Sequence, residues 1–246
     1  MICDFETDGF HIKCTESITN RPVIWESHCH TRFEMIAVSD GDITVMLEGQ
    51  SYRLKKDDII IIPPLSYHSI TANSEGVYKR ITALFDISAV PDVLRWDFIL
   101  KPFLFSFCVE KLGDVLHREN TLYYAPLVKS LMTEIFYEAE KESNDSHDIV
   151  TDEFLKASLK YIDEHLTEKL RLDDIARHTA RSKSSFCHLF FEKMNVSPKQ
   201  YILKKRLALA KKLIDEGMTH TAAAMHVGYY NYSNFYRLYK KNYGND

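Results

Sequence analysis

The first 90 residues alternate between short apolar stretches and turn-forming residues. Residues 43–49 alternate apolar and polar side chains, and residues 59–62 are four consecutive isoleucines that end at a pair of prolines. Turn-forming pairs recur at short spacing, namely Asp8-Gly9, Asp40-Gly41, Glu48-Gly49, Pro63-Pro64 and Asn73-Ser74. Many short strands separated by such turns are typical of a sandwich or barrel. The pattern therefore predicts an antiparallel β-barrel in the N-terminal part of the chain.

Residues 122–142 carry apolar side chains at helical spacing, which predicts an amphipathic helix. The apolar positions of this stripe are Tyr124, Val128, Leu131, Met132, Ile135, Phe136 and Ala139. A broad apolar face on a helix outside a barrel can pack on the barrel or on a second subunit. We expect the face to form an isologous contact in a homodimer.

A polar segment at 141–148 separates this helix from a C-terminal part in which every apolar stripe has helical spacing. Ser197, Pro198 and Gln200 form a capping box at the start of one long helix, and Gly217 marks its end. The sequence thus predicts two domains, at residues 1–145 and 150–246. The expected fold class is α+β multidomain, with an N-terminal antiparallel barrel and a C-terminal all-α domain.

The two parts of the chain differ in charge. Residues 1–150 contain 14 Lys and Arg against 24 Asp and Glu, whereas residues 151–246 contain 17 against 11. A basic part in a chain with a net charge of −4 is a candidate for a polyanionic partner. The alternative is that these Lys and Arg side chains only make the helices soluble.

The basic part contains an internal repeat. Residues 184–195 resemble residues 233–244 at an offset of 49, and residues 175–182 resemble 223–231 at an offset of 48. Each copy reads as a short helix, a tight turn at a small residue and a second helix with an N-cap, which is Ser182 or Asn231. This is the helix-turn-helix pattern, whose second helix can enter a DNA major groove.

Residues 152–244 resemble the DNA-binding domain of the AraC-type family of bacterial transcription regulators. The segments that carry the resemblance are LDDIA (172–176), Ser182, SPKQYILKKRLALAKKLI (197–214) and VGYYNYSNFYRLYKK (227–241). Thr179 and Arg181 stand where the family usually has apolar residues, and the family usually continues further beyond its last helix. The resemblance implies sequence-specific binding to a double-stranded DNA operator.

The resemblance places DNA contacts in the early turns of the second helix of each copy. The expected contact residues are Ser182, Ser184, Ser185, Cys187, His188, Asn231, Tyr232, Ser233, Asn234, Tyr236, Arg237, Lys240 and Lys241. Arg237 is suited to reading guanine, and Lys240 and Lys241 are suited to phosphates. For Tyr232 and Tyr236 the alternative is that they only pack against neighbouring residues.

The N-terminal part contains H-x-H-x3-E at residues 28–34 and a further histidine after a proline pair. His28, His30, Glu34 and His68 resemble the positions where cupin enzymes hold a divalent metal such as Fe, Mn, Ni or Zn. Asp57-Asp58 and Leu65 depart from the enzyme form of the second motif. We therefore expect a regulatory cupin-like barrel with no metal cofactor, in which these four residues contact each other or an effector.

A barrel interior is a natural pocket for a small-molecule effector. The residues that we expect to bind it are His28, His30, Glu34, His68, Arg32, Tyr52 and Tyr67, with Trp25, Phe33 and Phe85 as further aromatic walls and Arg53 and Arg80 as further anion partners. Aromatic walls with a few polar groups suit a sugar, whereas an arginine suits an acid. The sequence does not choose between these two ligands.

Two functions follow from these features, and a third reading is a DNA-binding fragment with an inert barrel. The first is a transcription regulator, not an enzyme, that binds an effector in its barrel, forms a homodimer and contacts RNA polymerase if it is an activator. The second is a metal-dependent cupin enzyme with a helical oligomerisation domain; the basic repeat favours the first. Five scattered cysteines without a CxxC pair, and an N-terminus without a signal-peptide pattern, predict a cytoplasmic protein with reduced thiols and no membrane partner.

Overall fold

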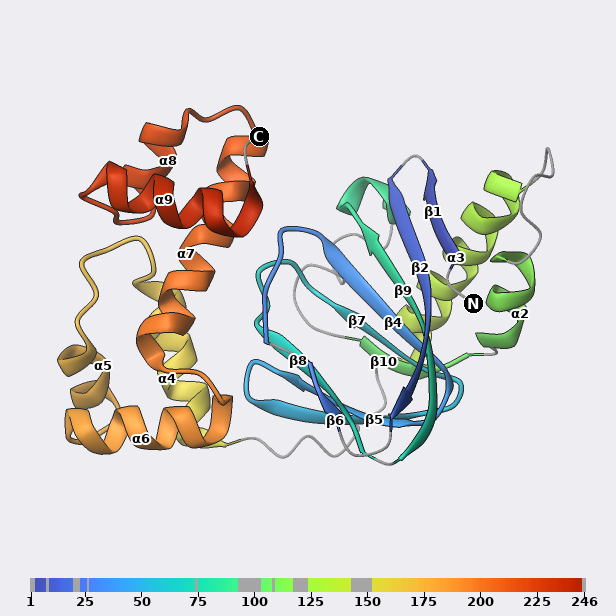
Figure 1. The fold of residues 1–246 in the computed structure, drawn as a ribbon, viewed down its shortest axis with the longest axis horizontal. Helices are drawn as coiled ribbons and strands as arrows, with labels where there is room; N and C mark the ends of the chain where they lie inside the picture. Colours follow the sequence, from blue (N-terminus) through green and yellow to red (C-terminus); the bar gives the residue numbers. More distant parts are fainter. Residues whose placement is uncertain are drawn as a thin grey trace. The chain divides into compact units, whose positions relative to one another are not determined.

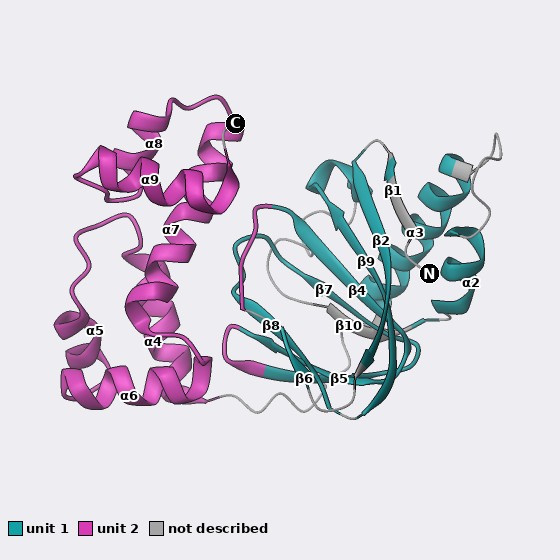
Figure 2. Ribbon diagram, viewed as in Figure 1, with its two compact units in different colours: residues 1–26, 32–47, 51–150 teal, residues 27–31, 48–50, 151–246 magenta. Residues whose placement is uncertain are grey.

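A computed structural model describes residues 3–7, 9–19, 23–25, 27–73, 75–92, 103–107, 109–116, 124–142 and 152–244. The chain divides into two compact units, coloured separately in Figure 2. Unit 1 comprises residues 1–26, 32–47 and 51–150, and unit 2 comprises residues 27–31, 48–50 and 151–246. Most of the polar segment expected to link two domains, residues 143–148, lies outside the described residues.

Unit 1 contains two antiparallel sheets, as the alternation of strands and turns predicts (Figure 1). The six-stranded sheet has the order β1-β2-β9-β4-β7-β10, and the four-stranded sheet has the order β3-β8-β5-β6. The strands are β1 (Cys3–Thr7), β2 (Phe10–Thr19), β3 (Val23–Ile24), β4 (Phe33–Asp40), β5 (Asp42–Leu47), β6 (Gln50–Lys55), β7 (Asp58–Ile62), β8 (His68–Ala72), β9 (Gly76–Phe85) and β10 (Phe103–Ser106).

The central strands of the larger sheet are covered on both faces. In β7, Ile60 and Ile62 join the core between the sheets, whereas Ile59 and Ile61 join a second core on the opposite face. Strand β4 divides its side chains between the same two cores. Because successive side chains of a strand point to opposite faces, a strand covered on both sides is apolar throughout. This explains the four consecutive isoleucines.

The second core lies between the six-stranded sheet and two helices, α2 (Val109–Leu116) and α3 (Tyr124–Glu142) (Figure 1). The predicted helix at 122–142 is thus confirmed, but the role expected for its apolar face is wrong. Val128, Leu131 and Ile135 are buried in the core that this helix forms with the sheet. They are therefore not available for a contact between subunits. The side chain of Tyr124 lies outside the described residues.

One cysteine departs from the expectation of reduced thiols. Cys14 is part of a disulfide, and the register of β1 and β2 places Cys3 opposite it. Cys29 and Cys187 are free thiols. The scattered spacing of the cysteines gave no sign of this bond, because cross-strand neighbours become visible only when the strand register is known.

The C-terminal residues of unit 2 are helical, as predicted. The helices are α4 (Glu153–Glu164), α5 (Leu172–His178), α6 (Lys183–Met194), α7 (Pro198–Asp215), α8 (His220–His226) and α9 (Tyr232–Tyr243). The predicted capping box is present at the start of α7, where the Ser197 hydroxyl accepts from the Gln200 N–H at 3.3 Å. Ser182 caps α6 and Asn231 caps α9, also as predicted. Among the described residues, no helix is long and apolar enough to cross a lipid bilayer.

Candidate nucleic-acid interface and effector site

The internal repeat corresponds to two turns of the same geometry. In the first turn, the Arg181 N–H donates to the Ala176 carbonyl at 2.8 Å, and in the second the Tyr229 N–H donates to the Ala224 carbonyl at 2.9 Å. Both donors and both acceptors are 48 residues apart. The residue before each donor, Ala180 or Gly228, has a positive φ, of 51° or 79°. The chain therefore builds two equivalent helix-turn-helix motifs, α5–α6 and α8–α9.

Thr179 and Arg181, which depart from the apolar residues usual in the family, are accommodated in the first turn. The Thr179 hydroxyl donates to the carbonyl of Ile175 at 3.1 Å. The Arg181 guanidinium lies 5.6 Å from the centre of the Phe154 ring. A hydrogen bond and a cation–π contact thus take the place of apolar packing at this turn.

The second turn requires its glycine more strictly than the first requires Ala180. A Cβ at Gly228 would lie 3.1 Å from the Thr167 carbonyl oxygen and 3.2 Å from the Arg206 guanidinium. We expect Gly228→Ala to destabilise the helical unit by about 1–3 kcal/mol, because the backbone strain of a positive φ and the repulsion of the close contacts both contribute. Ala180→Gly should instead stabilise it by about 1 kcal/mol. Thermal unfolding followed by circular dichroism measures both, and equal stability of the Gly228→Ala variant and the parent would contradict the steric argument.

A half-buried arginine that was not singled out from the sequence connects the parts of the helical unit. Arg206 of α7 donates to the Leu166 carbonyl at 2.7 Å and to the Gly228 carbonyl at 3.4 Å. It therefore joins the end of α4 to the second turn. Burial lowers the pKa of Arg206. The sequence offered no signal for this role, because the acceptors are backbone carbonyls.

The second helix of each motif buries corresponding aromatic residues. Phe186 and Phe190 of α6, and Phe235 and Tyr239 of α9, are nearly or fully buried. Leu238 packs against the core that contains Phe235 and Tyr239. Phe235, Leu238 and Tyr239 thus form the inward side of α9. The remaining positions of both helices are consequently free to present polar side chains to a partner.

The residues expected to contact DNA lie on this outward side. Ser185 and Cys187 are half-buried, and the others are exposed, namely Ser182, Ser184, His188, Asn231, Tyr232, Ser233, Asn234, Tyr236, Arg237, Lys240 and Lys241. The rings of Tyr232 and Tyr236 stack on each other with centroids 5.8 Å apart. One Arg237 Nη donates to the Asn234 side chain at 3.0 Å, which leaves its other donors available.

The two motifs differ in charge. Residues 220–243 contain three basic and no acidic residues, whereas residues 172–194 contain four basic and three acidic ones. In the first motif, Lys183 forms an ion pair with Asp173 at 2.9 Å. No ion-pair partner for Arg237, Lys240 or Lys241 is found among the described residues. The second motif therefore presents the stronger positive potential.

The four residues of the cupin-like motif are divided between the two units. His28 and His30 belong to unit 2, where their ring centroids lie 5.7 Å apart, and Glu34 and His68 belong to unit 1. Glu34 and His68 are buried, and a Glu34 carboxylate oxygen lies 2.8 Å from the His68 Nε2. The other ring nitrogen of His68 lies 2.9 Å from the Ser66 carbonyl oxygen, which fixes the orientation of the ring. Three imidazoles and a carboxylate are a suitable donor set for a divalent transition metal.

We expect the purified protein to contain less than one equivalent of transition metal. The Glu34 carboxylate and the His68 Nε2 already lie 2.8 Å apart, and Leu65 departs from the enzyme form of the motif. Elemental analysis of the parent protein and of His68→Ala measures this. Stoichiometric Fe, Mn, Ni or Zn in the parent that is lost in His68→Ala would contradict the expectation.

The remaining residues proposed for effector binding occupy different environments. Tyr52 and Tyr67 are buried, and Tyr52 belongs to the core between the sheets, where burial raises its pKa to about 12. One Arg32 Nη donates to the Gly9 carbonyl at 3.0 Å, and Arg32 also lies 3.5 Å from Asp86. Arg53, the additional anion partner considered, is exposed and bonded to Asp42. Arg53 is therefore not directed into the space between the sheets.

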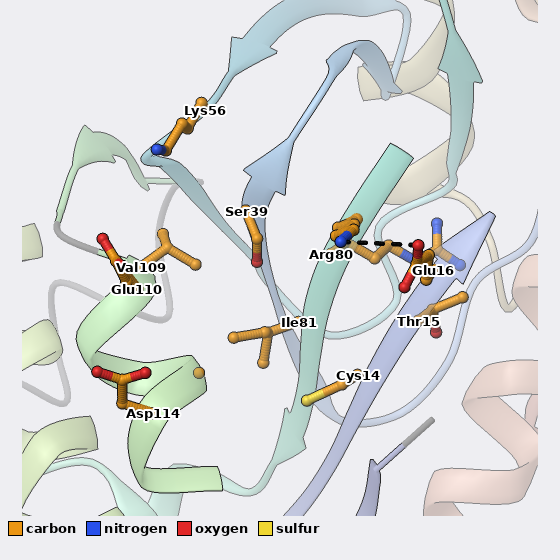
Figure 3. A pocket seen from close by; sticks show the side chains of 12 residues that line it. Cys14, Thr15, Glu16, Ser39, Lys56, Arg80, Ile81, Val109, Glu110 and Asp114 are labelled. Atoms are coloured by element: carbon orange, nitrogen blue, oxygen red, sulfur yellow. Dashed lines mark ion pairs between the residues drawn. The ribbon is translucent and has the colours of Figure 1, made fainter. Parts of the chain in front are cut away.

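A pocket of about 510 Å³ opens on the helix-covered side of the larger sheet. Figure 3 shows Cys14, Ile81 and Ser39 of the strands and Glu110 and Asp114 of α2 around it. Lys79 and Glu16 form an ion pair there at 3.6 Å. The sequence did not indicate this pocket, because its walls come from strands and a helix that are far apart in the chain.

Comparisons with known proteins agree with the two-part organisation. Residues 11–157 match the AraC-like ligand binding domain, and residues 175–245 match a helix-turn-helix domain. The uncharacterized HTH-type transcriptional regulators YdiP of Escherichia coli (strain K12) and YobQ of Bacillus subtilis (strain 168) are 27% and 26% identical to the chain. These matches cover 89% of the chain and 79% of YdiP, and 90% of the chain and 86% of YobQ.

Two further proteins show more limited likeness. The probable transcriptional regulator LumQ of Photobacterium leiognathi is 34% identical over 85 residues, which are 34% of the chain and 34% of LumQ. The structure of unsaturated fatty acid bound wild-type ToxT from Vibrio cholerae strain SCE256 aligns with a TM-score of 0.46 at 12% identity. That alignment covers 96% of the chain and 92% of ToxT.

Proposed function

The chain belongs to the AraC-type family of transcription regulators, with an AraC-like ligand-binding part and a helix-turn-helix part, and from this we propose which residues read DNA. The family consists of regulators and not enzymes, so the alternative of a metal-dependent cupin enzyme is rejected. In the proposal, α6 and α9 enter successive major grooves, and α9 contributes most of the affinity. The charge difference between the two motifs supports this order.

The contacts proposed for α9 follow from its exposed face. Arg237 offers two parallel donors that match guanine O6 and N7. Lys240 and Lys241, one turn further along, reach phosphates. The stacked rings of Tyr232 and Tyr236 present an apolar surface that suits thymine methyl groups. In the first motif, Ser184, Ser185, Cys187 and His188 take the equivalent positions and make weaker contacts, because they carry less charge.

We also propose that the regulator acts as a homodimer under the control of a small effector bound in the N-terminal part. Because Val128, Leu131 and Ile135 are buried within their own unit, the contact between subunits uses other residues. RNA polymerase is the further partner proposed if the protein activates transcription.

A footprint on operator DNA tests the arrangement of the motifs. One protomer should protect two segments about 10 bp apart on one face of the duplex, since successive major grooves recur with the helical repeat. The operator is first selected from random duplexes by rounds of binding at moderate salt. Protection of a single segment, unchanged when His188 is replaced by Ala, would refute the engagement of both motifs.

A further inference from the structure

Strand β9 is more deeply buried on its helix-covered face than on its inward face. Ile81, Ala83 and Phe85 belong to the core under the helices, whereas the intervening residues Arg80 and Thr82 are half-buried. The register pairs Arg80 with Val38 and Thr82 with Ile36. Since Val38 and Ile36 belong to the core between the sheets, Arg80 and Thr82 face the inside of the barrel. At Arg80 and Thr82 the inward face of β9 is thus partly reachable by solvent, whereas Tyr78 on the same face is buried.

Arg80 is held there by two aromatic rings. Its guanidinium carbon lies 5.4 Å from the centre of the Trp25 ring and 5.7 Å from the centre of the Tyr78 ring. One Nη donates to the Tyr78 hydroxyl at 3.4 Å. Burial raises the pKa of Tyr78, and the positive charge of Arg80 opposes that rise. The rings fix the position of the guanidinium without neutralising it.

No carboxylate of the described residues lies within ion-pair distance of Arg80. Its Nε is buried and has no hydrogen-bond partner there. Other partly buried cations of the same unit are compensated, as Arg32 is by Asp86 at 3.5 Å. A guanidinium that is partly removed from water and not paired is unfavourable, and an anion relieves this cost.

On this basis, and resting on the proposed control by an effector in the N-terminal part, we propose that the effector is a small organic acid. Its carboxylate binds Arg80, and its apolar body lies against Trp25 and the branched side chains of the barrel interior. Thr15 lies opposite Arg80 in the strand register, and Lys13 lies opposite Thr82.

Glu34 does not prevent an acid from binding at Arg80. Its backbone lies opposite Leu84, four residues and about 13 Å from that of Arg80 along β9, and no ion pair joins the two side chains. Its carboxylate is also 2.8 Å from His68. A neutral sugar, in contrast, leaves the charge of Arg80 uncompensated. Of the two ligands that the sequence left open, a sugar and an acid, Arg80 therefore favours the acid.

Fluorescence of Trp25 can report binding, because its ring contacts Arg80. Trp96→Phe leaves Trp25 as the single tryptophan of the chain. The probes are octanoate, benzoate and succinate, each compared with its amide, and glucose as a neutral sugar, all up to about 10 mM, ten times a Kd of 1 mM. We expect at least one acid to change the fluorescence saturably and its amide to bind at least tenfold more weakly.

The matching variants separate the role of Arg80 from a general loss of charge or fold. Arg80→Met should weaken binding of that acid at least tenfold, Arg80→Lys should retain part of it, and Arg53→Met should retain all of it. The comparison of acid with amide needs no substitution, so it remains decisive if Arg80→Met does not fold. Equal binding of acid and amide, binding of glucose alone, or no saturable response to any acid would each overturn the inference.

DNA binding is measured on the same variants without ligand. If Arg80→Met binds operator like the parent and only the response to acid is absent, the result supports both the proposed DNA-binding function and the assignment of an acid as effector. If the parent responds to a neutral compound and binds operator, the proposed control by an effector is supported, but the assignment of an acid as that effector is wrong. If the parent does not bind DNA, the proposed DNA contacts fail independently of the acid.

Discussion

Leu131→Glu is expected to unfold the N-terminal unit. Leu131 is 4% exposed and lies in the core between α3 and the six-stranded sheet. Loss of a buried leucine costs about 2–5 kcal/mol, and burial of a carboxylate without a partner adds to this. The total, about 5 kcal/mol or more, is comparable with the whole stability of many domains. The variant should therefore express poorly or melt far below the parent.

Urea unfolding followed by tryptophan fluorescence measures this effect, since both tryptophans, Trp25 and Trp96, lie in the N-terminal part. Leu127→Glu is the matched control, because Leu127 is on the same helix but 45% exposed. It should change the free energy of unfolding by less than about 0.5 kcal/mol. If Leu131→Glu unfolds like the parent but converts a dimer into monomers, the helix does use this face between subunits and the buried arrangement is wrong.

Arg237→Ala is expected to weaken operator binding by about 1–3 kcal/mol and to relax specificity at one base pair. The guanidinium is exposed and donates one hydrogen bond to the Asn234 side chain at 3.0 Å, which leaves donors for the proposed contact with guanine. Titrations of the variant against the selected operator, and against operators changed at single base pairs, measure both effects. Wild-type affinity in Arg237→Ala would mean that α9 does not read DNA through this residue.

The dependence of DNA binding on salt concentration distinguishes phosphate contacts from base contacts. Lys240→Ala or Lys241→Ala should weaken binding to all sequences alike and reduce the salt slope by about 0.9 for each phosphate that the protein no longer neutralises. Arg177→Ala is the control for charge alone, because Arg177 is exposed on α5 and paired with Asp174. His188→Ala should have a smaller effect than Arg237→Ala, since neutral imidazole is a weaker reader.

The helical part was largely predictable from sequence because its signals are local. Ser197, Pro198 and Gln200 mark the start of α7 within four residues, and the repeat at offsets of 48 and 49 gives both motifs. Caps and turns depend on side chains that bond their own backbone, so no long-range information is needed. The buried positions of α9 follow from the same periodicity.

The N-terminal part was less predictable, because its important contacts depend on strand register. Periodicity showed that α3 has an apolar face, but not whether a sheet or a second subunit covers it. Arg80 was one of several possible anion partners, and only its pairing with Val38 places it inside the barrel. A shift in register between Val38 and Asp40 makes counting along the strand unreliable at this point. The disulfide of Cys14 depends on strand pairing in the same way.

Helix α7, which joins the two motifs, is an 18-residue rod. At 1.5 Å per residue it is about 27 Å long, whereas one turn of B-DNA is about 34 Å long. If this length sets the separation of the two motifs, the second groove of straight DNA lies beyond the reach of the second motif. We then expect the duplex to bend toward the protein, and base pairs that no side chain touches to influence affinity through their stiffness. Flexible TA or CA steps in the middle of the operator should therefore favour binding.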